Sequence, residues 1–302
     1  MSWKQFIVHA GMPKTGTTHL QKTVFPRITD IAYIGRPFGL ADDHAKRISQ
    51  FLKGKRGAES VAHDIDSLFR LTDKDVLISH EGITGVALPH TIRGNIRIED
   101  LVSNITNLCR ACLLAGYSDF KIIIVVRQHE EWFASRYANL AKHTYFVSQS
   151  GFERFVKQAL RKEKTQPSAL NYKKLYSLLC KRIGEDRVCF LKHEDMINDK
   201  KRFSGDLARF IEKDREELIE FFETSKRTHV LRDEVSGKWS LRGYTLPWNK
   251  NLRYLVSVLQ KKGITIPRAK NKSIILTENL SNDIKSAYID SIEWVGEKLN
   301  KL

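Results

Sequence analysis

Gly11-Met-Pro-Lys-Thr-Gly-Thr-Thr18 is the stretch that decides the fold of this 302-residue chain. An apolar run, Phe6–Ala10, precedes it, and a helical pattern from His19 to Phe25 follows it. A strand, a tight glycine loop and a helix start in that order form a cradle for phosphate, because backbone N–H groups and the helix dipole point at the anion. The sequence therefore predicts an anion-binding loop in an α/β fold.

The loop departs from the pattern of ATP- and GTP-binding loops, G-x-x-x-x-G-K-[ST]. The spacing from Gly11 to Gly16 is kept, but Thr17 occupies the position of the lysine. The loop's lysine, Lys14, lies between the two glycines instead. This difference points away from a nucleotide whose γ-phosphate is bound together with Mg²⁺.

A second motif is Ile122-Ile-Ile-Val-Val-Arg127, with Ser135 eight residues further along the chain. Five β-branched residues in a row are typical of a strand buried on both faces of a parallel sheet. Arg127 would then lie at the carboxyl end of that strand, where open α/β sheets bind their ligands.

Both motifs resemble those of the sulfotransferases that use 3′-phosphoadenosine-5′-phosphosulfate (PAPS). Pro13-Lys-Thr-Gly-Thr-Thr18 is similar to the family's 5′-phosphosulfate loop, and Arg127 with Ser135 is similar to its 3′-phosphate-binding element. The resemblance implies that the 5′-phosphate binds the loop Pro13, Lys14, Thr15, Gly16, Thr17 and Thr18.

A weaker similarity concerns the adenine. Arg187–Met196 resembles the family's later strand, but His193 replaces an aromatic residue there. His19 stands where many members carry a tryptophan that stacks on adenine. An imidazole can also stack, so the resemblance implies adenine contacts for His19 and His193.

The resemblance also implies catalytic roles. Sulfuryl transfer is an in-line displacement in which positioning and cations do most of the work. Lys14 is expected to neutralise charge on the bridging oxygen as the bisphosphate product, PAP, leaves. The sulfuryl group carries less negative charge than a phosphoryl group, so no metal is expected.

The acceptor needs a general base, and Ser79-His-Glu-Gly82 follows a predicted central strand at the edge of the sheet used for chemistry. We favour Glu81, because Ser-x-Glu after such a strand resembles bacterial members of the family. His80 stays open, since an imidazole titrates near neutral pH unaided.

Composition indicates a globular protein with an anionic partner. Hydrophobic residues make up 41% and charged residues 28% of the chain, and the formal net charge is +16. The positive residues form no stretch interleaved with aromatics, so we expect no nucleic acid. PAPS and an anionic glycan account for part of the charge, and peripheral contact with an acidic membrane surface stays compatible with it.

The expected location is the cytoplasm, plausible for a bacterial enzyme. The apolar stretches are far shorter than a membrane span of about 20 residues, and the first strand leaves no room for a signal peptide. The chain has four cysteines, too few for a disulfide framework. Cys109 and Cys112 fall on the apolar stripe of a helical pattern and are predicted to be buried.

Alternating strands and helices predict a three-layer α/β fold with a mainly parallel, doubly wound sheet of the P-loop nucleotide-binding type. The predicted strands are Gln5–Ala10, Ile31–Ile34, Val76–Ser79, Lys121–Val126 and Val188–Leu191. The predicted helices are Thr17–Phe25, Asp42–Lys53, Val61–Leu71, Arg97–Ala115, Phe203–Ile211, Asn251–Lys262 and Asn282–Asn300. We expect one domain over 1–302, with a nucleotide-binding core in 1–225 and a helical C-terminal cap in 226–302. Within this cap, Thr228–Tyr244 has the composition of a loop.

The function expected from these features is a PAPS-dependent sulfotransferase that acts on a hydroxyl or amine of a carbohydrate or glycoconjugate. One alternative is an atypical P-loop kinase, which would need Mg²⁺ ligands such as an aspartate at a strand end. The predicted strand ends carry Arg127 and His80-Glu81 instead. The other alternative is a basic nucleic-acid-binding protein that retains a nucleotide-binding fold.

Overall fold

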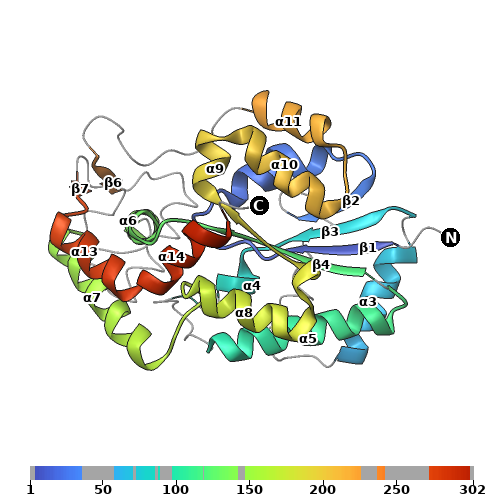
Figure 1. Ribbon diagram of the computed structural model, residues 1–302, viewed down its shortest axis with the longest axis horizontal. Coiled ribbons are helices and arrows are strands. Elements are labelled where there is room, and N and C mark those ends of the chain that lie inside the picture. The colour runs from blue at the N-terminus through green and yellow to red at the C-terminus, as the bar shows by residue number, and fades with distance from the viewer. Residues whose placement is uncertain are drawn as a thin grey trace, which may run out of the picture. The chain divides into compact units, whose positions relative to one another are not determined.

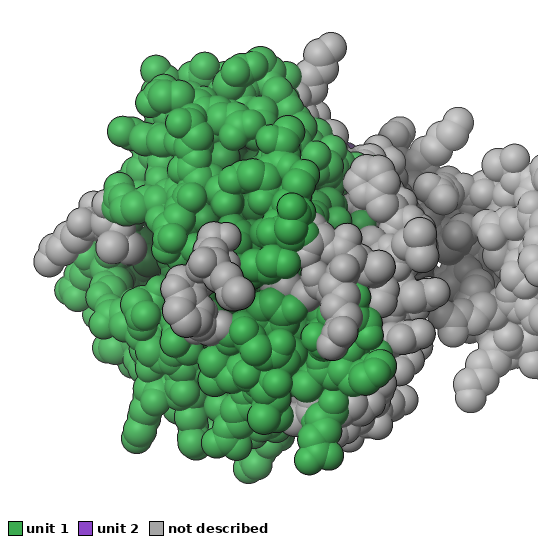
Figure 2. Space-filling model, turned by 90° about the vertical axis from the view of Figure 1, so that its right-hand side faces the viewer, with its two compact units in different colours: residues 1–128, 165–228, 288–302 green, residues 129–164, 229–287 purple. Residues whose placement is uncertain are grey.

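The computed structural model describes residues 4–35, 58–70, 73–85, 88, 97–117, 119–141, 147–225, 237–241 and 272–299. The chain divides into two compact units. The first unit comprises Met1–Gln128, Thr165–Thr228 and Tyr288–Leu302, and the second comprises His129–Lys164 and His229–Ala287. In Figure 2 the first unit appears as one continuous body. The division of the chain into a core over 1–225 and a cap over 226–302 stays a prediction.

A five-stranded parallel sheet, in the order β2-β3-β1-β4-β5, forms the centre of the first unit (Figure 1). Its strands are β1 (Gln5–His9), β2 (Ile31–Gly35), β3 (Asp75–Ser79), β4 (Asp119–Val126) and β5 (Val188–Lys192). Because β1 is the middle strand, the loop that follows it emerges between the ends of β3 and β4. The α/β fold with a parallel sheet is as expected, and each predicted strand is present within two residues of its predicted bounds.

Helices cover both faces of this sheet (Figure 1). On one face lie α10 (Lys200–Ile211) and α11 (Arg215–Glu223), with α9 (His193–Asn198) at the end of β5. On the other face lie α3 (Ala58–Arg70), α5 (Ile98–Leu114) and α8 (Tyr172–Ile183). The short elements of this unit are α1 (Thr17–His19), η1 (Leu20–Val24), η2 (Phe25–Arg27), α4 (Gly82–Gly85) and η4 (Glu185–Arg187).

Alternate residues of the strands point toward α10 and α11 and form the core beneath these helices. Ile7, Leu77 and Ile123 stand on the same face of neighbouring strands and join one buried cluster with Phe203 of α10 and Phe222 of α11. Successive strand residues point to opposite faces. His9, two residues after Ile7, therefore faces the same core at the carboxyl end of β1.

The segment Thr17–Phe25 is helical throughout, as predicted, but only its first turn is α-helix. After one turn of α-helix the chain widens into the π-helix η1 and then tightens into the 3₁₀ turn η2, which contains Pro26. The hydroxyl of Thr23 donates to the carbonyl of His19 at 2.5 Å. Such a bond competes with the backbone N–H for the carbonyl four residues back, which favours a wider turn.

The helix predicted over Asn282–Asn300 is two helices, α13 (Glu278–Ala287) and α14 (Ile289–Lys298). The break is at Tyr288, whose φ of −120° and ψ of 21° are not helical. The ring of Tyr288 is buried at 2% exposure, so burial of this side chain accompanies the break. The helices predicted over Asp42–Lys53 and Asn251–Lys262 lie outside the described residues.

The second unit contains α6 (His129–Leu140), α7 (Gln149–Thr165), α13 and a short antiparallel pair, β6 (Trp239–Leu241) with β7 (Lys272–Ile274). Trp239 pairs with Ile274, so part of Thr228–Tyr244 is a strand and the prediction of a loop there is wrong for these residues. The side-chain amide of Gln149 bonds both backbone groups of Ile275, at 3.0 and 2.9 Å.

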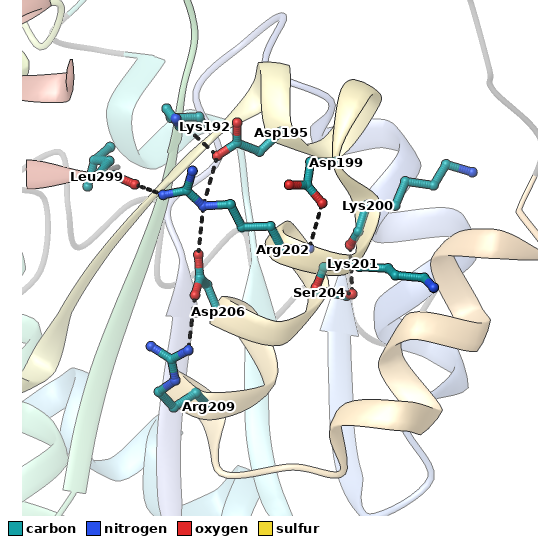
Figure 3. A network of polar contacts seen from close by, with 10 residues as sticks. All are labelled: Lys192, Asp195, Asp199, Lys200, Lys201, Arg202, Ser204, Asp206, Arg209 and Leu299. Carbon is teal, nitrogen blue, oxygen red and sulfur yellow. Dashed lines mark hydrogen bonds and ion pairs between the residues drawn. The ribbon is translucent and has the colours of Figure 1, made fainter. Parts of the chain in front are cut away.

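A polar network in the first unit joins α9 and α10 to the end of α14 (Figure 3). The guanidinium of Arg202 donates to the carbonyl of Leu299 and lies 3.9 Å from the carboxylate of Asp195. Lys192 pairs with the same carboxylate at 3.2 Å. Because Arg202 satisfies a carbonyl at the end of α14, this network attaches the C-terminal helix to the sheet's covering layer.

Candidate functional site

The carboxyl ends of β3, β1 and β4 are neighbours at the centre of the sheet. The predicted base segment follows β3, the glycine loop follows β1, and Arg127 follows β4. The structure brings two of these together, since Nη1 of Arg127 donates to the carbonyl oxygen of Lys14 at 2.9 Å. The charged residues at the opposite end of the strands pair with one another instead, as Lys121 does with Glu212 at 2.5 Å.

The loop between β1 and α1 contains two residues in the left-handed conformation. Lys14 has a φ of 73° and Gly16 has a φ of 80°. Left-handed residues that alternate with right-handed ones turn successive N–H groups toward a common point, which makes an anion-binding nest. The hydroxyls of Thr15 and Thr17 both donate to the carbonyl of Met12, at 2.7 and 3.1 Å, and close the loop on itself.

Helix α9 backs the loop. A Cβ built on Gly16 would lie 2.0 Å from Cε of Met196 and 3.2 Å from Cδ2 of His193. This distance places His193, a predicted adenine contact, beside the loop, and the residue is 9% exposed. Pro13 is buried, whereas Lys14 and Thr18 are half-buried.

Two residues that the sequence did not single out hold the backbone around Arg127. The hydroxyl of Tyr172, the first residue of α8, donates to the carbonyl of Arg127 at 2.8 Å. The carboxylate of Glu194 accepts the backbone N–H of Gln128 at 3.0 Å. Burial raises the pKa of Glu194, and the N–H of Gln128 and the charge of Arg127 oppose that rise. Glu194 lies in the segment that resembles the family's adenine strand, but no sequence signal marks Tyr172.

His19, the other predicted adenine contact, lies between Thr23 of η1 and Ser225. Its Nδ1 lies 3.1 Å from the hydroxyl of Thr23, and its Nε2 lies 3.2 Å from the hydroxyl of Ser225. Its ring centroid is 6.0 Å from that of Phe222. Burial lowers the pKa of His19, and the charge of Lys200 adds to this effect. Each ring nitrogen of His19 therefore lies beside a hydroxyl group from another part of the chain.

Buried polar contacts hold the end of β3. Nδ1 of His9 lies 2.7 Å from Oγ of Ser79, and the amide of Gln21 donates to the same Oγ at 2.9 Å. The backbone N–H of His80 donates to the carbonyl of His9 at 3.1 Å. His80 is half-buried and Glu81 is exposed. The choice between these two as the base stays open.

Ser135, the partner predicted for Arg127, belongs to α6 in the second unit and is 3% exposed. Its role at a 3′-phosphate stays a prediction. Cys109 and Cys112 are buried on α5, which confirms the expectation for both, and the four cysteines are free thiols.

Within the described ranges, no three His, Cys, Asp or Glu side chains come together as a group that could hold a metal ion. None of the helices in these ranges has the length and hydropathy that crossing a membrane requires.

The sequence of residues 4–242 matches the family model of the sulfotransferase domain. The match takes in the glycine loop, the end of β3, Arg127 and the segment after β5. The chain belongs to the sulfotransferase family. The family assigned from the Pro13–Thr18 loop and from Arg127 is thereby confirmed. A comparison with curated proteins finds no match.

Solved sulfotransferase structures are similar to this chain at low sequence identity. A sulfotransferase from Alicyclobacillus acidocaldarius is 14% identical with a TM-score of 0.45, over 86% of this chain and 93% of that one. The sulfotransferase domain of the Synechococcus PCC 7002 olefin synthase is 14% identical with a TM-score of 0.43, over 98% and 94%. A mouse sulfotransferase complexed with PAP is 13% identical with a TM-score of 0.39, over 98% and 80%. Membership of the family is shown by the match over residues 4–242.

Proposed function

We propose that this sulfotransferase moves a sulfuryl group from PAPS to a hydroxyl or amine of a carbohydrate or glycoconjugate acceptor. The observation that carries the proposal is the hydrogen bond from Arg127 to the carbonyl of Lys14. It joins the loop that resembles the family's 5′-phosphate element to the arginine of the motif that resembles its 3′-phosphate element. Two anion-binding elements side by side suit a nucleotide with phosphate on both ends of its ribose.

The 5′-phosphate is assigned to the loop. The left-handed conformations at Lys14 and Gly16 support this role, because they favour convergent N–H groups. The hydroxyl of Thr17 donates its one proton to Met12. We therefore assign the contact at this position to the backbone N–H of Thr17, together with the N–H groups of Gly16 and Thr18.

Lys14 is the proposed catalytic residue. PAPS supplies a sulfuryl group attached to a phosphate leaving group. The ammonium of Lys14 would neutralise the charge that develops on the bridging oxygen, which is electrostatic stabilisation in a partly dry site. Its half-buried position supports this role. The base that takes the acceptor's proton is assigned to Glu81, with His80 as the alternative.

The remaining contacts of the nucleotide follow from the same motifs. Arg127 and Ser135 are assigned to the 3′-phosphate, which suits a guanidinium with its planar fork of donors. His19 and His193 are assigned to the adenine. For His19 the contact would use a ring face, because a hydroxyl group lies beside each of its ring nitrogens.

A carbohydrate acceptor is supported by the formal net charge of +16, since many glycans are anionic and are attracted to a basic surface. The reaction would need no divalent metal, because Lys14 would supply positive charge at the transferred group and Arg127 would supply it at the nucleotide. Mg²⁺ is accordingly expected to be dispensable in the assay.

A thermal-shift experiment tests the proposal. PAP, ATP with Mg²⁺, and a single-stranded oligonucleotide are each added to the protein, and PAP is also tested with EDTA. A ligand that binds only the folded state at 100 times its Kd stabilises that state by about 2.7 kcal/mol. We expect a rise in Tm with PAP that EDTA does not reduce. A rise with ATP and Mg²⁺ alone would favour the kinase, and a rise with the oligonucleotide alone would favour the nucleic-acid-binding protein.

A further inference from the structure

Arg127 makes a contact that binding of a 3′-phosphate does not require. Its Nη1 donates to the main-chain carbonyl of Lys14, which lies 113 positions away in the sequence. A guanidinium carries five N–H donors. One of them can therefore hold the loop while others face an anion.

The backbone of Lys14 has a conformation that neighbouring contacts must stabilise. Its φ of 73° is in the left-handed region, which is unfavourable for a residue with a Cβ. Such conformations persist where surrounding contacts over-determine them. In this loop the contacts include the hydrogen bond from Arg127 to the carbonyl of Lys14. They also include the hydroxyls of Thr15 and Thr17, which donate to the carbonyl of Met12.

Arg127 is itself well anchored. Tyr172 of α8 binds its carbonyl, and Glu194 of α9 binds the N–H of the next residue, Gln128. The anchors come from two helices and lie on either side of the peptide that follows Arg127. The guanidinium therefore projects from a fixed point of the backbone toward the loop.

We propose that Arg127 is a positioning residue for Lys14, in addition to its assignment at the 3′-phosphate. Its hydrogen bond holds Lys14 in the left-handed conformation, which sets where the Lys14 side chain and the following N–H groups lie. Binding of a 3′-phosphate at the same guanidinium is then coupled to the placement of the residue assigned to catalysis. This inference rests on the proposed function for the identity of the nucleotide.

The test compares two ligands in calorimetric titrations: PAP and adenosine 5′-phosphate, which lacks the 3′-phosphate. The variants are Arg127→Met and the conservative Arg127→Lys. If Arg127 holds the loop, Arg127→Met weakens binding of adenosine 5′-phosphate about tenfold, as loss of one charge-assisted hydrogen bond would. PAP is weakened more, because it loses two interactions. Arg127→Lys, which keeps the charge and a donor, recovers part of both losses.

The matched control is Arg209→Met. Arg209 is an exposed arginine of α10, and its guanidinium lies 3.4 Å from Asp206. This variant removes the same charge and side-chain type without touching the loop, so the affinities for both ligands should stay within twofold of the starting protein. Melting curves of all variants establish that each is folded at the titration temperature.

A double-mutant cycle with Lys14→Gly addresses the backbone directly. Glycine adopts a positive φ at no steric cost. In the Lys14→Gly background we therefore expect Arg127→Met to change the affinity for adenosine 5′-phosphate less than threefold. With Lys14 present, the same substitution should also lower kcat at saturating PAPS rather than only raise KM.

Two results would overturn the inference. One is an unchanged affinity for adenosine 5′-phosphate in Arg127→Met, which would confine Arg127 to the 3′-phosphate. The other is an equal loss with and without Lys14→Gly. Neither result would contradict the proposed function, provided that the starting protein binds PAP. Failure of the starting protein to bind either ligand would instead overturn the proposed function.

Discussion

At the scale of single residues, the general base proposed for the acceptor belongs to the segment that follows β3. His80 and Glu81 follow Ser79, whose hydroxyl is held by His9 and Gln21. Adjacent residues project in different directions, so one of the two can reach a given acceptor while the other cannot. Glu81 is exposed and His80 is half-buried. A base that meets a diffusing acceptor needs access, which is consistent with the preference for Glu81.

Glu81→Gln is expected to lower turnover by about 10²-fold, the loss typical of a missing general base. Affinity for PAP should stay unchanged, because the phosphates are assigned to other residues. Initial rates with saturating PAPS and calorimetry with PAP measure the two effects, and His80→Asn is the matched control. If only His80→Asn lowers turnover, the base is His80. Normal turnover in both variants would place the base elsewhere in the chain.

At the scale of elements, the loop depends on its packing against α9. Two features disfavour a side chain at position 16. The φ of Gly16 is 80°, and Cε of Met196 would lie 2.0 Å from an added Cβ. The second feature links the conformation of the loop to the position of a helix 180 residues further along the chain. Met196 is buried at 6% exposure, so its terminal methyl group would have to repack within the core to admit a Cβ.

Gly16→Ala should therefore destabilise the protein by more than its backbone conformation alone would. The left-handed conformation accounts for about 1–2 kcal/mol, and repacking of Met196 adds to this. Gly116→Ala is a matched control, because Gly116 has a φ of 87° and its added Cβ would meet nothing within 4 Å. Unfolding in urea measures both free energies. Equal losses in the two variants would show that contact with Met196 has no part in the effect.

At the scale of the whole molecule, stability is tied to a histidine in the core. His9 is fully buried, and burial lowers its pKa from 6.5 to about 3. The folded state therefore keeps His9 neutral over a pH range in which the unfolded chain binds a proton. The unfolded state gains this proton below pH 6.5, so the stability associated with neutral His9 is present above pH 6.5 and is lost as the pH falls toward 3.

Acidification from pH 6.5 to 4.5 should thus lower the free energy of unfolding by up to about 1.4 kcal/mol per pH unit through His9. His9→Asn keeps a polar group near Ser79 and does not titrate in this range. The variant should lose about 2 kcal/mol less than the starting protein over these two units. Urea unfolding of both proteins at both pH values measures this difference. The contribution of the carboxylates is common to the two proteins and cancels. Equal losses of unfolding free energy in the two proteins would mean that His9 gains no proton on unfolding.

The sequence by itself determined the features that depend on local patterns. The β-branched run before Arg127 predicts a buried strand wherever it lies in the fold. The Gly11–Gly16 spacing after a strand predicts a tight loop that could bind an anion. The five strands, the α/β class and the family could all be predicted in this way. Of the candidate site, the loop, Arg127 and the His80-Glu81 pair were visible, since each directly follows a predicted strand.

Only the tertiary structure decided the features that depend on distant partners. The bond from Arg127 to Lys14 joins residues 113 positions apart, and the anchors Tyr172 and Glu194 come from separate helices. The break at Tyr288 coincides with burial of its ring, and the pairing of β6 with β7 joins segments far apart in the sequence. Such tertiary contacts override local propensity. Short-range patterns specify which backbone conformations are accessible, whereas long-range packing selects which residues meet.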